Sequence, residues 1–159
     1  MIRLPIYPAA PSRRPTDGPV RDVALTIDGA AVQVPEGATL LDACAAAGIE
    51  VPTLCFAANL TPVNACRICV VELEGARTLV PSCSRKVEAG MVVRTDSPRV
   101  RTARKLVLEL LGSSVDLSAA PNVARWIERY DAQPARFGPA AAPAAAGARD
   151  AAADRKSVV

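Results

Sequence analysis

Residues 55–83 read CFAANLTPVNACRICVVELEGARTLVPSC and hold four of the five cysteines of the chain. These four residues, Cys55, Cys66, Cys69 and Cys83, are spaced C-x10-C-x2-C-x13-C. Tetrahedral sites made of four thiolates suit either zinc or an iron–sulfur cluster. Structural zinc sites mostly use two close cysteine pairs, whereas this segment has one close pair and two distant cysteines. The spacing therefore favours an iron–sulfur cluster, with zinc as the alternative.

The close pair, Cys66 and Cys69, is expected to bind one iron from a tight loop. Cys55 and Cys83 would then bind the other iron, or the four cysteines would divide in a related way. Arg67 lies between the close pair, where its charge either offsets a negative cluster or faces solvent.

Cys44 is the fifth cysteine and stands outside this spacing. It falls on an expected helix at the phase of Leu40 and Leu41, which directs it toward a core. A buried free cysteine behaves as a small hydrophobe. We prefer this interpretation to a ligand or redox role for Cys44.

The segment before the cysteines predicts a hairpin followed by a helix. Two strand-like runs at 23–27 and 31–34 are separated by Asp28-Gly29, which is a strong hairpin turn signal. Thr39 is suited to cap the N-terminus of the helix, and Gly48 is suited to end it.

The segment after the close pair predicts further short strands at 68–73, 78–80 and 91–95. A helix is expected to follow, with Ser97 as its N-cap, Pro98 at its first position and Gly112 at its end. Its expected apolar face consists of Val100, Ala103, Val107 and Leu110, widened by Leu106 and Leu111. Its basic residues form either a solvated face or a docking patch for an acidic partner, and they are Arg99, Arg101, Arg104 and Lys105. A shorter helix is expected at 122–130, with Val123, Trp126, Ile127 and Tyr130 on one side.

The order hairpin, helix, cysteine loop, hairpin and strand predicts an α+β fold, in which a small mixed sheet packs on one helix. This is the β-grasp arrangement in which plant-type ferredoxins carry their cluster. We expect an extended N-terminal arm at 1–22, the β-grasp domain at 23–96, a helical extension at 97–133 and a flexible Pro/Ala-rich tail at 134–159.

Composition excludes several classes of function. The chain has no histidine, which removes the commonest general base and the Ser-His and Cys-His nucleophile pairs. Its net charge of +3 is too mild for a nucleic-acid binder, and no apolar run approaches the roughly 20 residues that membrane insertion requires. The N-terminus lacks the apolar region of a secretory signal. We therefore expect a cytoplasmic protein, where clustered cysteines indicate metal or redox chemistry.

Five short stretches carry a family resemblance: IEVPTLC, CRICVVELEGAR, LVPSC, EAGMVVRTDS and RKLVLELL. Together with the preceding hairpin and helix, they resemble, over about residues 23–111, the N-terminal [2Fe–2S] domain shared by three groups of proteins. These are the large iron–sulfur subunit of respiratory complex I, the diaphorase small subunit of NAD-linked hydrogenases and the NAD-dependent molybdenum or tungsten formate dehydrogenases. The resemblance implies that Cys55, Cys66, Cys69 and Cys83 are the ligands of one [2Fe–2S] cluster in a chain of cofactors.

The sequence departs from this family after the RKLVLELL helix. Many family members continue with a His-and-Cys segment that holds a [4Fe–4S] cluster, whereas residues 112–138 here contain neither residue type. We therefore expect a single cluster and no catalytic domain. The predicted function is a non-catalytic electron-transfer subunit that relays single electrons between a flavin-containing, NADH-oxidising subunit and a catalytic molybdenum/tungsten or nickel–iron subunit. The alternatives are a free-standing ferredoxin shuttle and a zinc-stabilised interaction module.

Overall fold

The computed structural model describes residues 21–117 and 120–139, and the chain divides into two compact units after Val107. The first unit contains five strands and a short helix, and a second helix begins in it and continues past the division. In chain order its elements are β1 (Asp22–Ile27), β2 (Ala30–Pro35), α1 (Leu40–Ala46), β3 (Val70–Leu73), β4 (Val80–Pro81), β5 (Val92–Arg94) and the start of α2 (Pro98–Ser114). The second unit adds α3 (Pro121–Arg129) and the 3-10 helix η1 (Pro134–Phe137).

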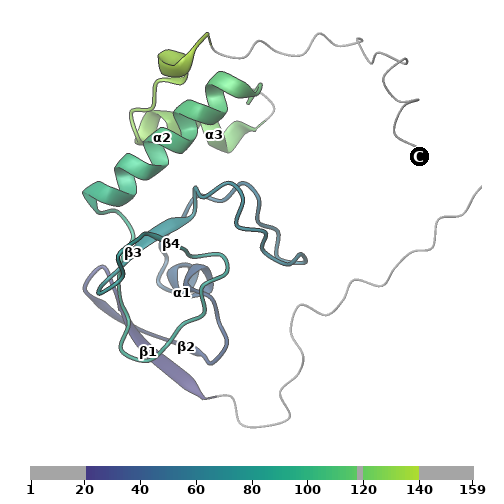
Figure 1. The fold of residues 1–159 in the computed structure, drawn as a ribbon. Coiled ribbons are helices and arrows are strands. Elements are labelled where there is room, and N and C mark those ends of the chain that lie inside the picture. Colours follow the sequence, from purple (N-terminus) through teal and green to yellow (C-terminus); the bar gives the residue numbers. More distant parts are fainter. Residues whose placement is uncertain (1–20, 118–119, 140–159) are drawn as a thin grey trace, which may run out of the picture. The chain divides into compact units, whose positions relative to one another are not determined.

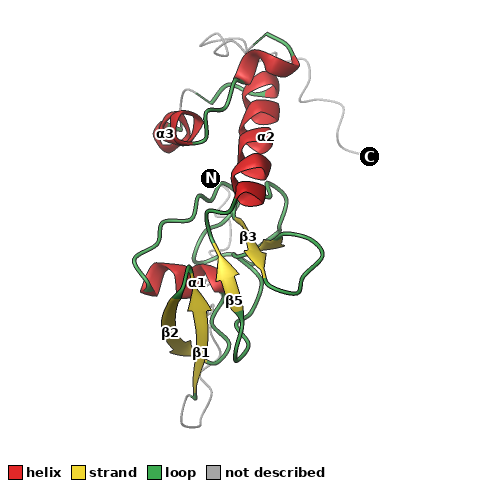
Figure 2. Ribbon diagram, turned by 90° about the vertical axis from the view of Figure 1, so that its left-hand side faces the viewer, coloured by secondary structure: helices red, strands yellow, loops and turns green. Residues whose placement is uncertain are grey.

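The five strands form one mixed sheet in the order β2-β1-β5-β3-β4. β1 runs antiparallel to β2 and parallel to β5, and β3 runs antiparallel to both β5 and β4. Figures 1 and 2 show α1 lying beside this sheet. Apolar residues of the sheet and of α1 share one core, which includes Leu25, Ile27, Val93, Leu40 and Ala43. The predicted α+β, β-grasp fold is confirmed.

The first hairpin turns at the predicted dipeptide. Asp28 and Gly29 have φ values of 49° and 86°, which is the left-handed geometry that a two-residue hairpin turn needs at both central positions. The Asp28 carboxylate also accepts hydrogen bonds from the backbone N–H and the hydroxyl of Thr95, at 2.8 and 2.5 Å. The turn therefore anchors the chain just after β5.

Helix α1 begins and ends where the sequence predicts. The Thr39 hydroxyl accepts a hydrogen bond from the backbone N–H of Asp42 (3.1 Å), and the Asp42 carboxylate accepts one from the N–H of Thr39 (2.9 Å). This reciprocal pair is a capping box. Gly48 has a φ of 72° just past the helix end, and Cys44 is fully buried in the core, as expected of a small hydrophobe.

Helix α2 starts as predicted, since the Ser97 hydroxyl accepts a hydrogen bond from the Val100 N–H at 3.3 Å. Its predicted end at Gly112 is wrong, because the helix continues to Ser114. Gly112 serves a different purpose: a Cβ at this position would lie 2.7 Å from the Cβ of Pro134. The glycine therefore permits a close approach of two segments and does not terminate the helix.

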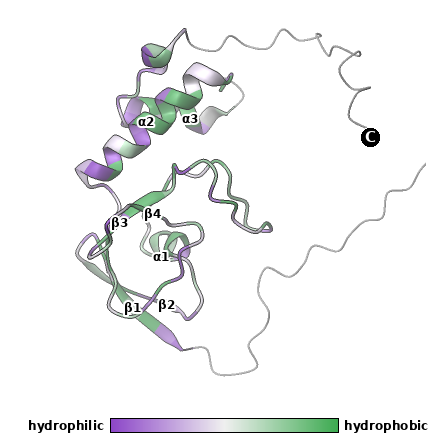
Figure 3. Ribbon diagram, viewed as in Figure 1, coloured by the Kyte–Doolittle hydropathy of each residue, from purple (hydrophilic) through white to green (hydrophobic). Residues whose placement is uncertain are grey.

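The predicted apolar face of α2 is also partly wrong. Val100 is buried, but Leu110 is 51% exposed, whereas Arg104 is only 1% exposed. Hydrophilic and hydrophobic residues are interspersed along this helix (Figure 3), which makes its buried stripe hard to locate from hydropathy. Arg104 was expected in a solvated or docking face, and its burial is explained by hydrogen bonds to backbone carbonyls, described below.

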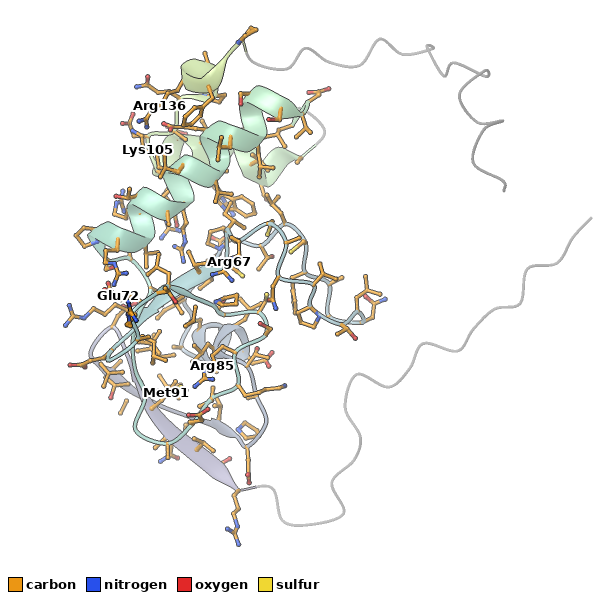
Figure 4. The ribbon with its side chains drawn as sticks, viewed as in Figure 1. Arg67, Glu72, Arg85, Met91, Lys105 and Arg136 are labelled. Carbon is orange, nitrogen blue, oxygen red and sulfur yellow. The ribbon has the colours of Figure 1, made fainter. Side chains whose placement is uncertain are left out.

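In the second unit, Val123 and Trp126 of α3 and its C-cap residue Tyr130 are buried, and Ile127 is partly buried, in agreement with the predicted side of that helix. Residues 134–137, predicted to belong to the tail, form η1. Arg136 of η1, labelled in Figure 4, pairs with the buried Glu109 carboxylate at 3.0 Å. Residues 140–159 of the predicted tail, and the N-terminal arm up to residue 20, lie outside the described residues. Within the described ranges, none of the helices has the length and apolar content required to cross a bilayer.

The substitution Gly112→Ala tests the role assigned to this glycine. Alanine stabilises an unobstructed helix interior by about 1 kcal/mol relative to glycine. We expect the opposite sign here, a lower midpoint of thermal unfolding, because the new Cβ would meet Pro134. A higher midpoint in the variant would contradict the close approach.

Candidate metal centre

The four cysteines of the predicted site come from three places in the first unit. Cys55 and Cys66 lie in the loop between α1 and β3, Cys69 directly precedes β3, and Cys83 follows β4 by two residues. All four are free thiols. Because β3 and β4 pair antiparallel, with Val70 opposite Pro81, the ends of these strands carry Cys69 and Cys83 to the same place.

The cysteines form two contacting pairs. The Sγ atoms of Cys69 and Cys83 are 3.4 Å apart, and the backbone N–H of Cys66 donates to the Sγ of Cys55 at 3.5 Å. The first pair is buried and the second is half-buried. The structure thus brings Cys55 into contact with Cys66 and Cys69 into contact with Cys83. The division of the four cysteines between two irons stays a prediction.

Two residues with left-handed backbone flank Cys66 and shape the loop. Asn64 and Arg67 have φ values of 57° and 58°, a conformation that is unusual for residues other than glycine. The Asn64 side-chain oxygen accepts a hydrogen bond from the Cys83 thiol at 3.4 Å. Asparagine tolerates this backbone conformation better than most residues. The contact of its side chain with Cys83, which lies 19 positions away, was not predicted from the sequence.

Arg67 connects the loop to the segment before β4. Its guanidinium donates to the backbone carbonyl of Leu79 at 3.1 Å, and Figure 4 shows the residue at the base of the cysteine loop. Arg67 is exposed, in agreement with the expectation that it faces solvent, and its effect on a cluster charge stays a prediction. The hydrogen bond also gives Arg67 a part in holding the loop in place.

The pKa values of the Cys55 and Cys83 thiols are shifted in opposite directions. The N–H of Cys66 lowers the pKa of the Cys55 thiol below its usual value, because a hydrogen-bond donor stabilises the thiolate. Burial raises the pKa of Cys83 to about 12, and the hydrogen bond with Cys69 adds to the effect. Metal ligation requires thiolates, so filling this site would release protons, and Cys83 holds its proton to higher pH than Cys55.

The donor set can be compared with what different metal groups need. In the part of the chain that the structure describes, no three His, Cys, Asp or Glu residues are grouped to hold a single metal ion. A dinuclear iron–sulfur cluster takes two thiolates on each iron, bridged by sulfide. Two neighbouring thiol pairs, one in the loop and one at the strand ends, fit that donor pattern.

Cys44 is separate from this centre and offers a test of the core. Burial raises the pKa of its thiol to about 11, with the negative charge of Asp28 adding to the rise and the positive charge of Arg104 opposing it. The folded chain therefore keeps the proton to higher pH than the unfolded chain, whose thiol titrates near pH 9. The resulting stabilisation is complete below about pH 9 and is lost as the pH rises through 11.

We expect Cys44→Ala to remove this pH dependence. Near pH 8 the variant should be less stable by about 1 kcal/mol, because a buried sulfur atom is lost. Between about pH 9 and pH 11 the wild type should lose about 2 kcal/mol more than the variant. The free energy of unfolding, measured by denaturant titration of the reduced chain, checks this. Parallel pH profiles would contradict the buried thiol.

Comparison with known proteins identifies the segment that carries this site. Residues 20–98 match the family model described as "2Fe-2S iron-sulfur cluster binding domain". The matched segment contains the whole sheet, α1 and all four cysteines of the two pairs.

Two curated relatives illustrate the proteins in which similar segments occur. The NADP-reducing hydrogenase subunit HndD of Solidesulfovibrio fructosivorans is 50% identical over 95 residues, which cover 56% of this chain and 16% of the relative. A subunit of the NADH-quinone oxidoreductase of Rickettsia prowazekii (strain Madrid E) is 43% identical over 89 residues, or 56% of this chain and 13% of the relative. The chain therefore spans only a small part of the length of the relatives it matches.

A solved structure shares the fold. A chain of the NAD+-reducing [NiFe]-hydrogenase, in the H2-reduced state, superimposes with a TM-score of 0.64 at 24% sequence identity. The match covers 77% of this chain and 54% of that chain. At this level of identity the likeness concerns the fold.

Proposed function

Residues 20–98 belong to the 2Fe–2S iron–sulfur cluster binding domain family, and from this premise we propose that Cys55, Cys66, Cys69 and Cys83 hold the cluster. The observation that carries the proposal is the presence of two cysteine contacts, Cys55 with Cys66 in the loop and Cys69 with Cys83 beside the paired ends of β3 and β4. Cys55 and Cys66 would bind one iron and Cys69 and Cys83 the other. The cluster supplies reversible one-electron chemistry when bound.

The two irons would differ in their access to solvent. The buried pair, Cys69 and Cys83, faces the core, whereas Cys55 and Cys66 are half-buried in the loop. The same loop exposes Leu60 and Val63, which are 66% and 68% accessible. Electron exchange with a partner would therefore take place on the loop side, where the path from the cluster to the surface is shorter.

We propose that the chain acts as a single-cluster electron-transfer subunit of a multi-subunit NAD(H)-linked oxidoreductase. The names of the relatives, a subunit of a NADP-reducing hydrogenase and a subunit of a NADH-quinone oxidoreductase, support this assignment. A flavin subunit would separate the two electrons of a hydride, and this chain would pass them singly to a catalytic molybdenum/tungsten or nickel–iron subunit. Residues 112–138 contain no His and no Cys that could hold a second cluster, which supports a single cluster, at the four cysteines of the first unit.

The cofactor is tested by spectroscopy on the full chain. The purified protein should be brown, contain two irons and two acid-labile sulfides, and give a rhombic electron paramagnetic resonance signal after reduction with dithionite. A colourless protein with one bound zinc would overturn the proposal.

Substitutions at Cys69, a proposed ligand, and at Cys44, the cysteine outside the site, test which cysteines hold the cluster. Cys69→Ser should lose the cluster or hold it far more weakly, because a hydroxyl replaces a thiolate ligand. Cys44→Ser should keep the cluster, since Cys44 lies in the apolar core. The visible absorbance and iron content of both variants report the result. Loss of the cluster from Cys44→Ser together with its retention in Cys69→Ser would refute the ligand assignment.

The proposed assembly is tested by affinity purification of the tagged chain from its native source. A flavin-containing subunit and a catalytic subunit with molybdenum, tungsten or nickel should copurify in fixed stoichiometry. Recovery of the cluster-loaded chain alone, at monomer mass, would instead support a free-standing ferredoxin.

A further inference from the structure

Arg104 of α2 is the largest side chain in the described part of the protein that is fully buried. A charged guanidinium is costly to remove from water unless its N–H groups are bonded. A leucine at this position of α2 could be buried without that cost. The burial of an arginine here therefore indicates a specific role for its side chain.

Arg104 donates to the two carbonyls that flank Cys69. Its Nε lies 3.2 Å from the oxygen of Ile68, and its Nη2 lies 2.9 Å from the oxygen of Val70. The rigid, planar guanidinium fixes the separation of its donors, so the two bonds hold the backbone on both sides of Cys69.

Sheet topology explains why these carbonyls need a side-chain donor. The carbonyl of Cys69 faces β4, where it accepts from the Ser82 N–H at 3.2 Å. Alternation along an extended chain directs the carbonyls of residues 68 and 70 to the other side, toward β5. The register places Glu72 opposite Arg94, the last residue of β5, so the chain before Glu72 runs past the end of that strand. Arg104 supplies the donors that β5 does not.

Ser82 holds the backbone of Cys69 from the side opposite Arg104. Its hydroxyl, fully buried, donates to the carbonyl of Cys69 at 2.8 Å, and Ser82 directly precedes Cys83. Three consecutive carbonyls, at residues 68, 69 and 70, are thus held by side chains from elsewhere in the chain. One of these side chains is on α2, and the other is adjacent in sequence to the second cysteine of the buried pair.

The positive charge of Arg104 also acts on another group in the core. The pKa of the Cys44 thiol is raised mainly by burial, but the positive charge of Arg104 lowers it in part. Reduction of an iron–sulfur cluster adds one negative charge to the site. A fixed positive charge favours the reduced form, and net charge and hydrogen bonding are established controls of cluster potential.

We propose that Arg104 is a positioning residue for the ligand Cys69 and that its buried charge raises the reduction potential of the cluster. This inference rests on the proposed [2Fe–2S] site. Two separate effects are thereby assigned to one side chain. The pair of N–H donors holds the backbone around Cys69, and the positive charge raises the reduction potential of the cluster.

Two substitutions separate these properties. Arg104→Lys keeps the charge and loses the planar pair of donors, and Arg104→Gln loses the charge. Arg101→Gln is the matched control, because Arg101 lies on the same helix, is half exposed and pairs with Asp96 at 2.9 Å. The measurements on the full, cluster-loaded chain are the midpoint potential, by redox titration, and the rate of iron loss to a chelator.

We expect Arg104→Lys to lose iron about 10- to 100-fold faster than wild type, the usual cost of removing a partner that orients a metal ligand, with a potential close to wild type. Arg104→Gln should lose iron comparably fast and show a more negative potential, whereas Arg101→Gln should match wild type in both. If Arg104→Gln folds but takes up no iron while Arg104→Lys takes it up, the need for a positive charge beside the cluster is supported. If Arg104→Gln alone is unfolded, the charge stabilises the fold and the outcome counts against the inference.

The inference is overturned if both Arg104 variants retain iron at the wild-type rate, or if a loaded Arg104→Gln keeps the wild-type potential. Failure of both variants to take up iron, with the fold retained by circular dichroism, supports the positioning role. If the reduced, iron-free forms of both are unfolded, the residue is a general stabiliser and the inference fails. A wild-type chain that binds no cluster would instead refute the proposed function, so the two failures are distinguishable.

Discussion

The backbone around Cys69 is the constraint on which the candidate site depends. Its own carbonyl is bonded to Ser82, and the carbonyls before and after it are bonded to Arg104. These bonds join β3, the turn after β4 and helix α2 around one cysteine. Buried carbonyls left without donors would each cost about 1–3 kcal/mol, so the same contacts that orient the thiol also stabilise the fold.

The site combines a rigid half with a more accessible half. Cys69 and Cys83 lie beside the ends of the paired strands β3 and β4 and are buried, whereas Cys55 and Cys66 belong to a loop shaped by the left-handed residues Asn64 and Arg67. The thiol pKa values follow the same division, lowered for Cys55 by a backbone N–H and raised for Cys83 by burial. This arrangement suits an electron carrier, because one side is insulated and the other lies near the surface.

Much of the local structure was predictable because its causes are local. The Asp28-Gly29 turn, the Thr39 cap and the Ser97 cap each depend on the conformational preference or hydrogen bonding of residues within one turn. The end of α2 was not predictable in this way. Glycine commonly ends a helix, but the role of Gly112 depends on Pro134, which is 22 positions away in sequence.

The order of elements, the four cysteines and the family of residues 20–98 could all be read from the chain before it is folded, because periodicity, turn chemistry and ligand spacing are one-dimensional properties. Which thiols pair, and what Arg104 does, depend on contacts that form only when distant segments meet. Cys66 is nearest to Cys69 in sequence, and strand pairing brings Cys83, 14 positions away, into contact with Cys69. From sequence alone, an arginine on a helix is expected to face solvent. The backbone carbonyls to which Arg104 donates belong to residues 34 and 36 positions earlier, so only the folded structure brings them beside it.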